Sequence, residues 1–293
     1  MKSINNLSKI TVILVLYQES EDLIFKNLEK IKNFNIIILD NNSNLNLKKK
    51  ITSKFKIEKY ILSKRNLGFS MGYNIAIKFC STEFLFILNA DCFIDESNTL
   101  KLLNYIQTNP NCMLVAPTSF DSIGNFTYCS GNLPEKNNKN EYLIIDGNSC
   151  VESVLGSAMF MRTKDFLELG MFDKNLFIYF SDDDLCRTIL KKKKSIVQLS
   201  ESTCIHTHGI SKVKNSLRKI FLKEHYYTLD ELFYFQKVNK HQVLYFNLKK
   251  KIKNYVIKML INFFILNFKD SIKYYSRILA FIKFNFFLRK SNK

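Results

Sequence analysis

The sequence lacks the patterns that mark several common classes of protein. Its seven cysteines include no C-x-x-C pair, which argues against a disulfide framework or a zinc site and for reduced core residues in a cytosolic protein. No G-x-G-x-x-G follows the first apolar run and no G-x-x-x-x-G-K-S/T occurs, so a dinucleotide oxidoreductase and a P-loop enzyme are disfavoured. No small-residue cleavage site follows Ile10–Tyr17, and Gln18–Asp22 opens a charged helix instead. We therefore take Ile10–Tyr17 as a buried strand and not as a signal peptide.

Acidic residues are scarce beside basic ones. The chain has 44 Lys and Arg against 26 Asp and Glu, a formal net charge of +18. A charge of this size directs the choice of partner, and nucleic acid, anionic lipid and a phosphorylated substrate are all candidates. We expect no nucleic-acid partner, because the basic residues are scattered or concentrated in the tail and no zinc-finger spacing or RNP-type aromatic motif is present.

The length and apolar content bound the fold class. With 293 residues, 46% of them hydrophobic, the chain can hold one large α/β domain and an appendage. Short apolar runs alternate with helical patterns through the first two hundred residues, which predicts a mostly parallel sheet covered by helices. The expected strands are Ile10–Tyr17, Asn35–Asp40, Lys59–Leu62, Phe84–Asn89, Met113–Pro117, Val151–Met161 and Ser195–Leu199. The expected helices are Glu21–Lys32, Phe69–Cys80, Glu96–Thr108, Lys164–Leu169 and Asp182–Lys193, with residues 118–150 as a hairpin or long loop.

Carboxylates gather at two kinds of position in this basic chain. Asp182–Asp184 stand at the mouth of an expected helix, and Asp40 and Asp91 each end an apolar run. In open sheets of this type, ligands bind beyond the carboxyl ends of the strands. The acidic run also fits a helix start, with Ser181 as N-cap and aspartates favoured by the helix dipole. The run alone leaves helix capping and catalysis as open alternatives.

The chain beyond about residue 212 has a different composition. It contains no glycine or proline and is rich in Phe, Tyr, Ile and Lys, which predicts a basic amphipathic helical region. Its longest uncharged run, Met259–Phe268, would be about 15 Å long as a helix, too short for a hydrocarbon core of about 30 Å. A single helix would gather Lys251, Lys258, Asn262, Lys269 and Lys273 in one arc. We expect this face to lie on an anionic membrane surface with Phe263, Phe264 and Phe268 in the acyl boundary; packing on the catalytic domain or a homodimer interface is the alternative.

Eight segments follow one another in a defined order along residues 10–211. They are Ile13–Tyr17, Leu39–Ser43, Asn66–Phe69 with Gly72 and Asn74, Leu88–Asp91, Gly156–Met159, Phe172–Asp173, the acidic run and His206–Ser211. Together they resemble the family 2 inverting glycosyltransferases, in particular the rhamnosyltransferase-like branch that builds bacterial surface polysaccharides. The resemblance implies a GT-A type α/β sandwich as the catalytic domain over residues 1–211, followed by the helical region 212–293.

The resemblance also implies a reaction. A sugar would pass from a nucleotide diphosphate sugar, with dTDP-rhamnose as the first guess, to a hydroxyl of a glycan or lipid-linked acceptor, with inversion at the anomeric carbon. We expect the enzyme in the cytoplasm, on the inner face of the cytoplasmic membrane. The alternative is an inactive sugar-nucleotide-binding or scaffold protein on the same fold, because Asn89 and Ser181 stand where acids could be.

The donor and metal residues follow from the same resemblance. Asn89-Ala90-Asp91 takes the place of the D-x-D motif, which assigns Asp91 to a Mg²⁺ or Mn²⁺ ion on the donor diphosphate. His206 would complete the metal site, with His208 as the alternative. Asp40 would bond the base or ribose, or would only form a turn. The residues assigned to the donor are Tyr17, Asp40, Asn42, Asn66, Gly68, Asn74 and Asn89.

The acidic run supplies the expected catalytic group. Asp182 aligns with the base that takes the proton of the acceptor hydroxyl. Asp184 and Arg187 are assigned to the acceptor side, where Asp184 would orient an acceptor hydroxyl or the basic side chain of Arg187. Ser181 departs from the usual Glu-Asp-x-Asp form of the family, and Asp183 stands at its variable position.

Overall fold

The structure is a computed structural model that describes residues 6–127, 129–136, 147–207, 216–238 and 241–291. The chain forms two compact units. The N-terminal unit contains Met1–Asp173 and Ser181–Lys212, and the C-terminal unit contains Lys174–Phe180 and Val213–Lys293. The short segment Lys174–Phe180 therefore belongs with the C-terminal helices, although the chain continues from it directly into the acidic run.

A mixed sheet forms the middle of the N-terminal unit. Over the described residues it has nine strands, in the order β3-β2-β1-β4-β10-β6-β11-β5, with β8 paired to β11. β3, β2, β1 and β4 run parallel, as do β6 and β11, and β10 is antiparallel to its neighbours. The strands are β1 Ile10–Leu16, β2 Asn35–Asp40, β3 Lys59–Leu62, β4 Phe84–Leu88, β5 Cys92–Phe93, β6 Cys112–Phe120, β8 Ser149–Cys150, β10 Ala158–Arg162 and β11 Ser195–His206. A separate small pair joins β7 Ser130–Gly131 to β9 Ser153–Val154.

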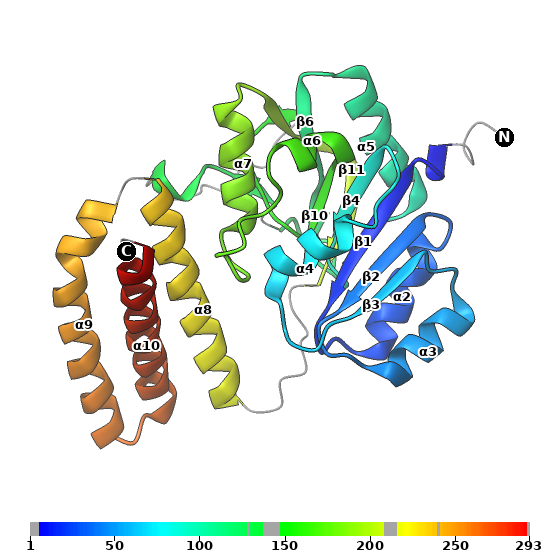
Figure 1. Cartoon of the computed structure of the whole chain (residues 1–293). Coiled ribbons are helices and arrows are strands. Elements are labelled where there is room, and N and C mark those ends of the chain that lie inside the picture. Colours follow the sequence, from blue (N-terminus) through cyan, green and yellow to red (C-terminus); the bar gives the residue numbers. More distant parts are fainter. Residues whose placement is uncertain (1–5, 128, 137–146, 208–215, 239–240, 292–293) are drawn as a thin grey trace. The chain divides into compact units, whose positions relative to one another are not determined.

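Helices cover both faces of this sheet (Figure 1). α2, α3 and α5 share one apolar core with it, and α4, α6 and α7 share the other. The sheet strands are apolar on both sides, as expected for strands buried between two helical layers. The helices are α2 Glu21–Ile31, α3 Leu45–Lys54, α4 Gly68–Ile77, α5 Glu96–Thr108, α6 Thr163–Glu168 and α7 Ser181–Lys191, with a 3₁₀ turn at Pro134–Lys136. The α/β fold class predicted from the sequence is confirmed.

Three of the differences from the sequence-based expectation have a clear physical reason. α3 was not predicted, because only Leu47 and Ile51 of its residues are buried and the apolar signal is weak. The expected strand Val151–Met161 divides into β9 and β10, since the backbone around Gly156 turns to meet α7. The last strand continues beyond Leu199 to His206, across a break in its register with β6.

The C-terminal unit is helical. It contains α8 Ser216–Lys237, α9 His241–Phe264 and α10 Phe268–Ser291. Its core joins α8 to α10 through Leu229, Leu232, Ala280, Phe281 and Phe284. Within the described residues, each helix is too short or too polar to span a bilayer.

The prediction of one continuous basic helix in the tail is wrong. α9 ends at Phe264, Leu266 has a positive φ of 61°, and Asn267 begins a new helix by accepting a hydrogen bond from the amide of Asp270. Lys269 and Lys273 therefore lie on α10 and do not share a face of one helix with the lysines of α9. An αL residue followed by a capping Asn is a common way to end one helix and start the next.

One buried carboxylate holds the segment Lys174–Phe180 within the C-terminal unit. Asp230, on α8, accepts hydrogen bonds from the backbone amides of Phe177, Ile178 and Tyr179 at 3.0, 2.9 and 2.9 Å. Burial raises the pKa of Asp230 to about 6, although the three amide donors favour its ionised form. The ring of Phe177 also stacks on that of Tyr226, with centroids 3.9 Å apart. Side chain and ring contacts thus fix the segment that leads into α7.

We predict that Asp230→Ala destabilises the C-terminal unit. Each buried amide left without its acceptor costs about 1–3 kcal/mol, so the free energy of unfolding should fall by several kcal/mol. Asp230→Asn should fall between wild type and alanine, because its amide oxygen can still accept. Thermal unfolding followed by circular dichroism measures the difference. An Asp230→Ala melting temperature equal to that of wild type would contradict this role.

Candidate donor, metal and base site

The candidate site is built where three parallel strands end side by side. Leu16 of β1 is paired with Asp40 of β2, and Leu14 of β1 is paired with Leu88 of β4. Asp40 is the last residue of β2, and the turns after β1 and β4 carry Glu19 and Asp91, so the sheet places three carboxyl groups at one edge. This is the edge where open α/β sheets bind their ligands.

A buried asparagine shapes the turn that carries Asp91. Asn27, on α2, donates from Nδ2 to the carbonyl oxygens of Asn89, Ala90 and Cys92 at 3.2, 2.9 and 2.9 Å. Sequence reasoning missed Asn27. The available signal was a polar residue within the buried stripe of the helix formed by Ile24, Leu28 and Ile31. One side chain therefore replaces the hydrogen bonds that a regular strand would have given these carbonyls.

Asp91 and His206, both assigned to the metal from the sequence, lie together, and their binding of a metal stays a prediction. Nε2 of His206 is 3.5 Å from Oδ1 of Asp91, and both side chains are largely buried. Their proximity arises because β11 runs on to His206, which pairs with Cys92, and because the amide of Thr207 donates to the carbonyl oxygen of Asp91 at 3.0 Å. His208 lies outside the described residues.

The donor set of this pair fits a divalent ion. A carboxylate oxygen and an imidazole nitrogen suit Mn²⁺, and a substrate diphosphate and water usually supply the remaining ligands of such an ion. Within the part of the chain that the structure describes, no third His, Cys, Asp or Glu joins Asp91 and His206 in a metal-binding cluster. The protein side of the site would therefore be a pair and not a complete cage.

Glu19 is a further acid at this edge that sequence reasoning assigned to a helix. The chain turns back at Gln18, which has a φ of 63°, and Oε2 of Glu19 accepts from the amide of Tyr17 at 2.5 Å. Burial raises the pKa of Glu19 to about 7, and the charges of Asp91 and Asp40 add to the rise. The missed signal was its position three residues beyond the end of a strand, the same distance at which Asp91 follows β4.

Asp40 forms a turn, the alternative that the sequence left open. Its carboxylate accepts from the amides of Asn42 and Asn44 at 2.7 and 2.9 Å and from the hydroxyl of Tyr60 at 3.3 Å. The side chain is almost fully buried, whereas Asn42 is exposed. Burial raises the pKa of the Tyr60 hydroxyl, which keeps it a donor to Asp40. Contact of Asp40 with a nucleotide stays a prediction.

The loop before α4 is closed by its own side chains. Oδ1 of Asn66 accepts from the amide of Gly68 at 2.9 Å, and Gly68 has a φ of 71°, which favours glycine. Asn41 bonds the same loop through the amide of Leu67 at 3.0 Å and the carbonyl oxygen of Gly68 at 3.3 Å. Asn66 and Gly68 therefore have a loop-forming role, beside the donor contact predicted for them.

Asn74 has a structural role in the fold, and its assignment to the donor stays a prediction. Its Nδ2 donates to the carbonyl oxygen of Phe172 at 2.8 Å, and its Oδ1 accepts from the amide of the same residue at 3.1 Å. The side chain is buried, so its hydrogen bonds fix residue 172 against α4. Asn89 is more accessible, and its Oδ1 accepts from the hydroxyl of Tyr73 at 3.3 Å.

The acidic run begins α7, and its first two aspartates are partly exposed. Oδ2 of Asp182 accepts from the amide of Gly156 at 2.7 Å, and Oδ1 of Asp183 accepts from the hydroxyl of Ser153 at 2.6 Å. Burial raises the pKa of Asp182, and burial together with the charge of Asp182 raises the pKa of Asp183 to about 8. The hydroxyl of Ser181 is 2.6 Å from that of Ser70 on α4, which ties the start of α7 to that helix.

Gly156 is required by its contact with the acidic run. A Cβ atom at residue 156 would lie 2.9 Å from Cζ of Phe69 and 3.2 Å from Oδ2 of Asp182.

Asp184 and Arg187, predicted for the acceptor side, are both buried. Their burial favours an orienting role over direct contact with an acceptor.

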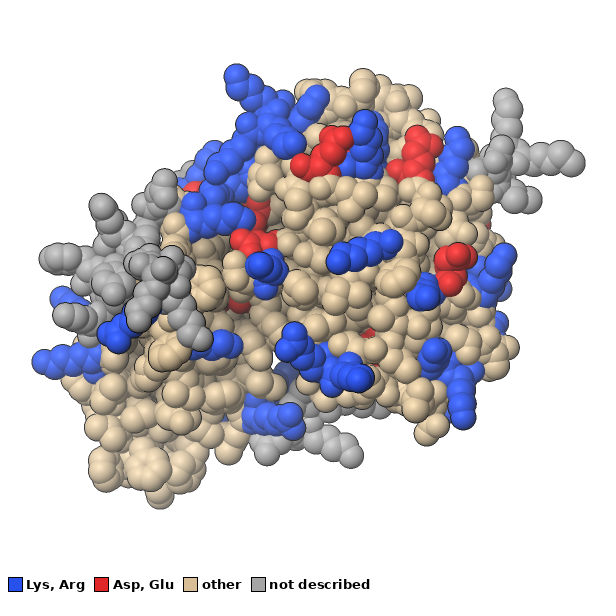
Figure 2. Space-filling view, in the orientation of Figure 1, with Lys and Arg blue, Asp and Glu red and all other residues tan. Residues whose placement is uncertain are grey.

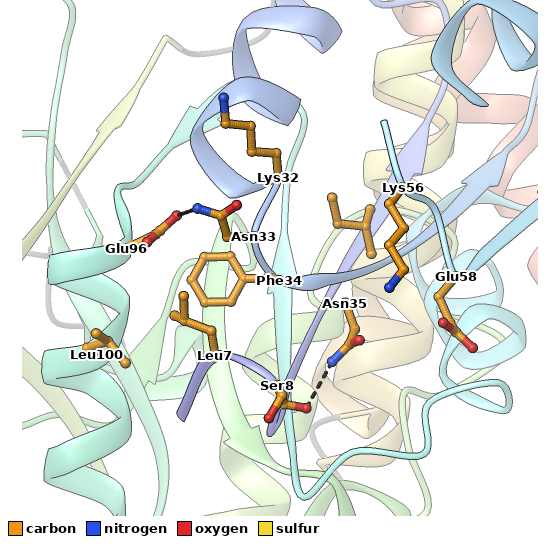
Figure 3. A pocket seen from close by; sticks show the side chains of 11 residues that line it. Leu7, Ser8, Lys32, Asn33, Phe34, Asn35, Lys56, Glu58, Glu96 and Leu100 are labelled. Atoms are coloured by element: carbon orange, nitrogen blue, oxygen red, sulfur yellow. Dashed lines mark hydrogen bonds between the residues drawn. The ribbon is translucent and has the colours of Figure 1, made fainter. Parts of the chain in front are cut away.

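A cavity in the N-terminal unit lies at the other edge of the sheet (Figure 3). It has a volume of about 540 Å³ and lies at the amino ends of β1 and β2, next to Ser8 and Asn35. Nδ2 of Asn35 donates to the carbonyl oxygen of Ser8 at 2.9 Å, and Nδ2 of Asn33 donates to Oε1 of Glu96 at 2.6 Å. None of the residues predicted for the donor, metal or base lines this cavity.

Comparison with known proteins identifies the family. Residues 11–169, more than half of the chain, match the model of glycosyl transferase family 2. The chain belongs to glycosyl transferase family 2. The matched residues include the three strand ends, with Asp40 at the end of β2, and the turns that carry Glu19 and Asp91.

Individual relatives agree with this family. Over 190 residues the family 2 chain is 25% identical to a dTDP-rhamnosyl transferase, RfbF, of Shigella flexneri, covering 63% of this chain and 64% of that protein. The solved structure of GalNAc-T7 with UDP, GalNAc and Mn²⁺ matches with a TM-score of 0.56 and 14% identity, over 76% of this chain and 50% of that one. The mannosyltransferase PcManGT from Pyrobaculum calidifontis, in complex with GDP-Man and Mn²⁺, matches with a TM-score of 0.55 and 11% identity. The match covers 75% of this chain and 62% of that one. These structures show that the fold is of the GT-A type.

We predict that Asn27→Ala weakens binding of Mn²⁺ in the presence of a nucleotide diphosphate. The substitution leaves the carbonyls of residues 89, 90 and 92 without their donor and frees the turn that carries Asp91. Loss of such a supporting hydrogen bond typically costs about 10–100-fold in metal affinity. Isothermal titration measures this affinity.

Asn33→Ala is the matched control for this prediction. Asn33 is exposed just beyond the same helix and bonds Glu96, far from the strand ends. Its substitution should leave the Mn²⁺ affinity unchanged. Equal affinities for Asn27→Ala and Asn33→Ala would show that Asn27 does not support the site.

Proposed function

We propose that this family 2 protein is a metal-dependent, inverting glycosyltransferase. Its donor would be a nucleotide diphosphate sugar, with dTDP-rhamnose as the first choice, and its acceptor a hydroxyl of a glycan or lipid-linked glycan. The similarity to a dTDP-rhamnosyl transferase supports this donor, and it extends over 64% of that protein. The two solved relatives contain Mn²⁺ and a nucleotide or nucleotide sugar, which supports the metal and the donor class.

One observation carries the proposal: residues 156 and 157 connect the base to the metal turn. The amide of Gly156 donates to Asp182 at 2.7 Å, and the carbonyl oxygen of Ser157 accepts from the amide of Asn89 at 2.9 Å. A general base and a diphosphate site must lie on opposite sides of one anomeric carbon, within the size of a sugar ring. Two adjacent residues that touch both groups support this spacing.

Each group of residues has its own role in the proposed reaction. Asp182 accepts the proton from the acceptor hydroxyl as that oxygen attacks the anomeric carbon from the side opposite the diphosphate. The burial that raises the pKa of Asp182 also makes its carboxylate a stronger base, and Gly156 holds the carboxylate in place. A divalent ion held by Asp91 and His206 would neutralise charge on the departing diphosphate.

A binding protein without activity is the second candidate. It is favoured by Ser181, whose hydroxyl is tied to Ser70, at the position where the family usually has an acid. In that case the chain would bind a sugar nucleotide without turning it over.

We place the active enzyme on the inner face of the cytoplasmic membrane, since a lipid-linked acceptor is presented at a bilayer surface.

A donor screen with an active-site variant tests the proposed function. We expect the protein, with Mn²⁺ present, to release dTDP from dTDP-rhamnose faster than it releases UDP or GDP from the corresponding sugar nucleotides. Asp182→Asn should lower kcat by about 10²–10⁴-fold with little change in donor affinity, because an amide keeps the shape but cannot take the proton.

Asp183→Asn is the matched control on the neighbouring residue. It should retain most of the activity, because Asp183 is engaged by Ser153 and stands at the variable position. Turnover of Asp182→Asn close to wild type would exclude Asp182 as the base. Binding of a sugar nucleotide without turnover by wild type would favour the inactive binding protein.

A further inference from the structure

The turn between α9 and α10 exposes a continuous apolar surface. We call its residues Phe263, Phe264, Ile265, Leu266 and Phe268 the apolar tip. Their side chains are between 47% and 77% exposed. In the view of Figure 2, this end of the C-terminal unit is free of charged atoms on the visible face. Contiguous exposed apolar residues on a soluble surface mark a site of contact with a partner or a membrane.

Three consecutive backbone amides of the turn are paired within it. The amide of Ile265 donates to the carbonyl oxygen of Ile261 at 3.1 Å, and the amide of Leu266 to that of Phe263 at 3.1 Å. The amide of Asn267 bonds the carbonyl oxygen of Asn262 at 2.8 Å. A turn that enters an apolar medium must pair its amides internally, because no water is there to do so.

Leu266 is an unusual residue at the point of the turn. Its φ of 61° lies in the left-handed region, where glycine or asparagine is favoured and a leucine is strained. The side chain is 73% exposed, so packing within the C-terminal unit does not compensate for this strain. The exposed leucine side chain is available for contact with something outside the unit.

The charges around the apolar tip are basic. No Asp or Glu occurs between His241 and Lys269, and Lys258 and Lys269 flank the tip on either side. The first acid, Asp270, accepts a hydrogen bond from Nδ2 of Asn267 at 3.0 Å. Apolar side chains flanked by lysines are complementary to an anionic bilayer, because the apolar groups can enter the acyl region while the lysines contact the anionic headgroups just outside it.

We propose that the apolar tip inserts end-on into an anionic membrane leaflet. The lysines that flank it remain among the headgroups while Phe264 and Leu266 enter the acyl boundary. This inference rests on the proposed location of the enzyme and replaces the flat amphipathic helix expected from the sequence. A second copy of the chain is a poorer occupant, because two such tips would bring like-charged borders together.

A tryptophan placed in the apolar tip reports on insertion. The chain contains no tryptophan, so full-length Phe264→Trp has a single fluorophore of this kind. Vesicles of phosphatidylglycerol and phosphatidylcholine should shift its emission to shorter wavelength, and lipids brominated in the acyl chains should quench it. Vesicles of phosphatidylcholine alone, or high salt, should reduce both effects, since the lysines then lose their attraction.

Phe286→Trp is the matched control. Phe286 is also an exposed phenylalanine of α10, about 27 Å along the helix from Phe268. Its emission should not respond to vesicles. Equal responses of the two variants, or none from Phe264→Trp, would overturn the proposal. A blue shift of Phe264→Trp that depends on protein concentration without vesicles would overturn it in favour of self-association.

The variant Phe264→Asp separates this inference from the proposed enzyme activity. It should lose cosedimentation with anionic vesicles while keeping wild-type release of the nucleotide diphosphate from the donor in solution. Unchanged cosedimentation would overturn the role of the apolar tip. Absence of turnover in wild type, with vesicle binding intact, would contradict the enzyme activity and leave the insertion supported.

Discussion

The structure of the site depends on three parallel strands ending at one edge and on the buried side-chain amides that shape the chain beyond them. β1, β2 and β4 bring their carboxyl ends together by register alone. Beyond those ends the backbone leaves the sheet and loses its ladder hydrogen bonds. Asn27 and Asn41 supply replacements, the first to the turn of Asp91 and the second to the loop before α4. The side-chain Nδ2 groups of both asparagines are buried and paired with carbonyl oxygens of the backbone.

The candidate base, Asp182, lies at the start of α7, far along the chain from the three strand ends. α7 is attached to the site through Gly156, which leaves no room for a side chain between Phe69 and Asp182. The segment just before α7 is held in the C-terminal unit by Asp230. The residues on either side of Ser181 are therefore fixed by two separate sets of hydrogen bonds. A side chain at residue 156 would disturb the start of α7 directly, because the amide of Gly156 donates to Asp182.

The sequence predicted the parts of the fold that depend on local patterns. The strands Asn35–Asp40 and Lys59–Leu62 and the helix Glu96–Thr108 have the predicted bounds, because apolar periodicity and flanking polar residues mark them clearly. The pairing of Asp91 with His206 was predicted from resemblance. The role of Asn27 is tertiary, since its partners lie more than sixty residues away. The break at Leu266 also escaped prediction, because no glycine or proline marks it.

The central claim is that Asp91 holds a divalent ion together with the donor diphosphate. Electron paramagnetic resonance of Mn²⁺, titrated into the protein with dTDP, tests it directly. We expect a bound Mn²⁺ signal that needs dTDP, disappears in Asp91→Asn and persists in Asp95→Asn, whose exposed side chain caps α5. A bound signal in Asp91→Asn equal to that of wild type would contradict the assignment of Asp91 to the metal.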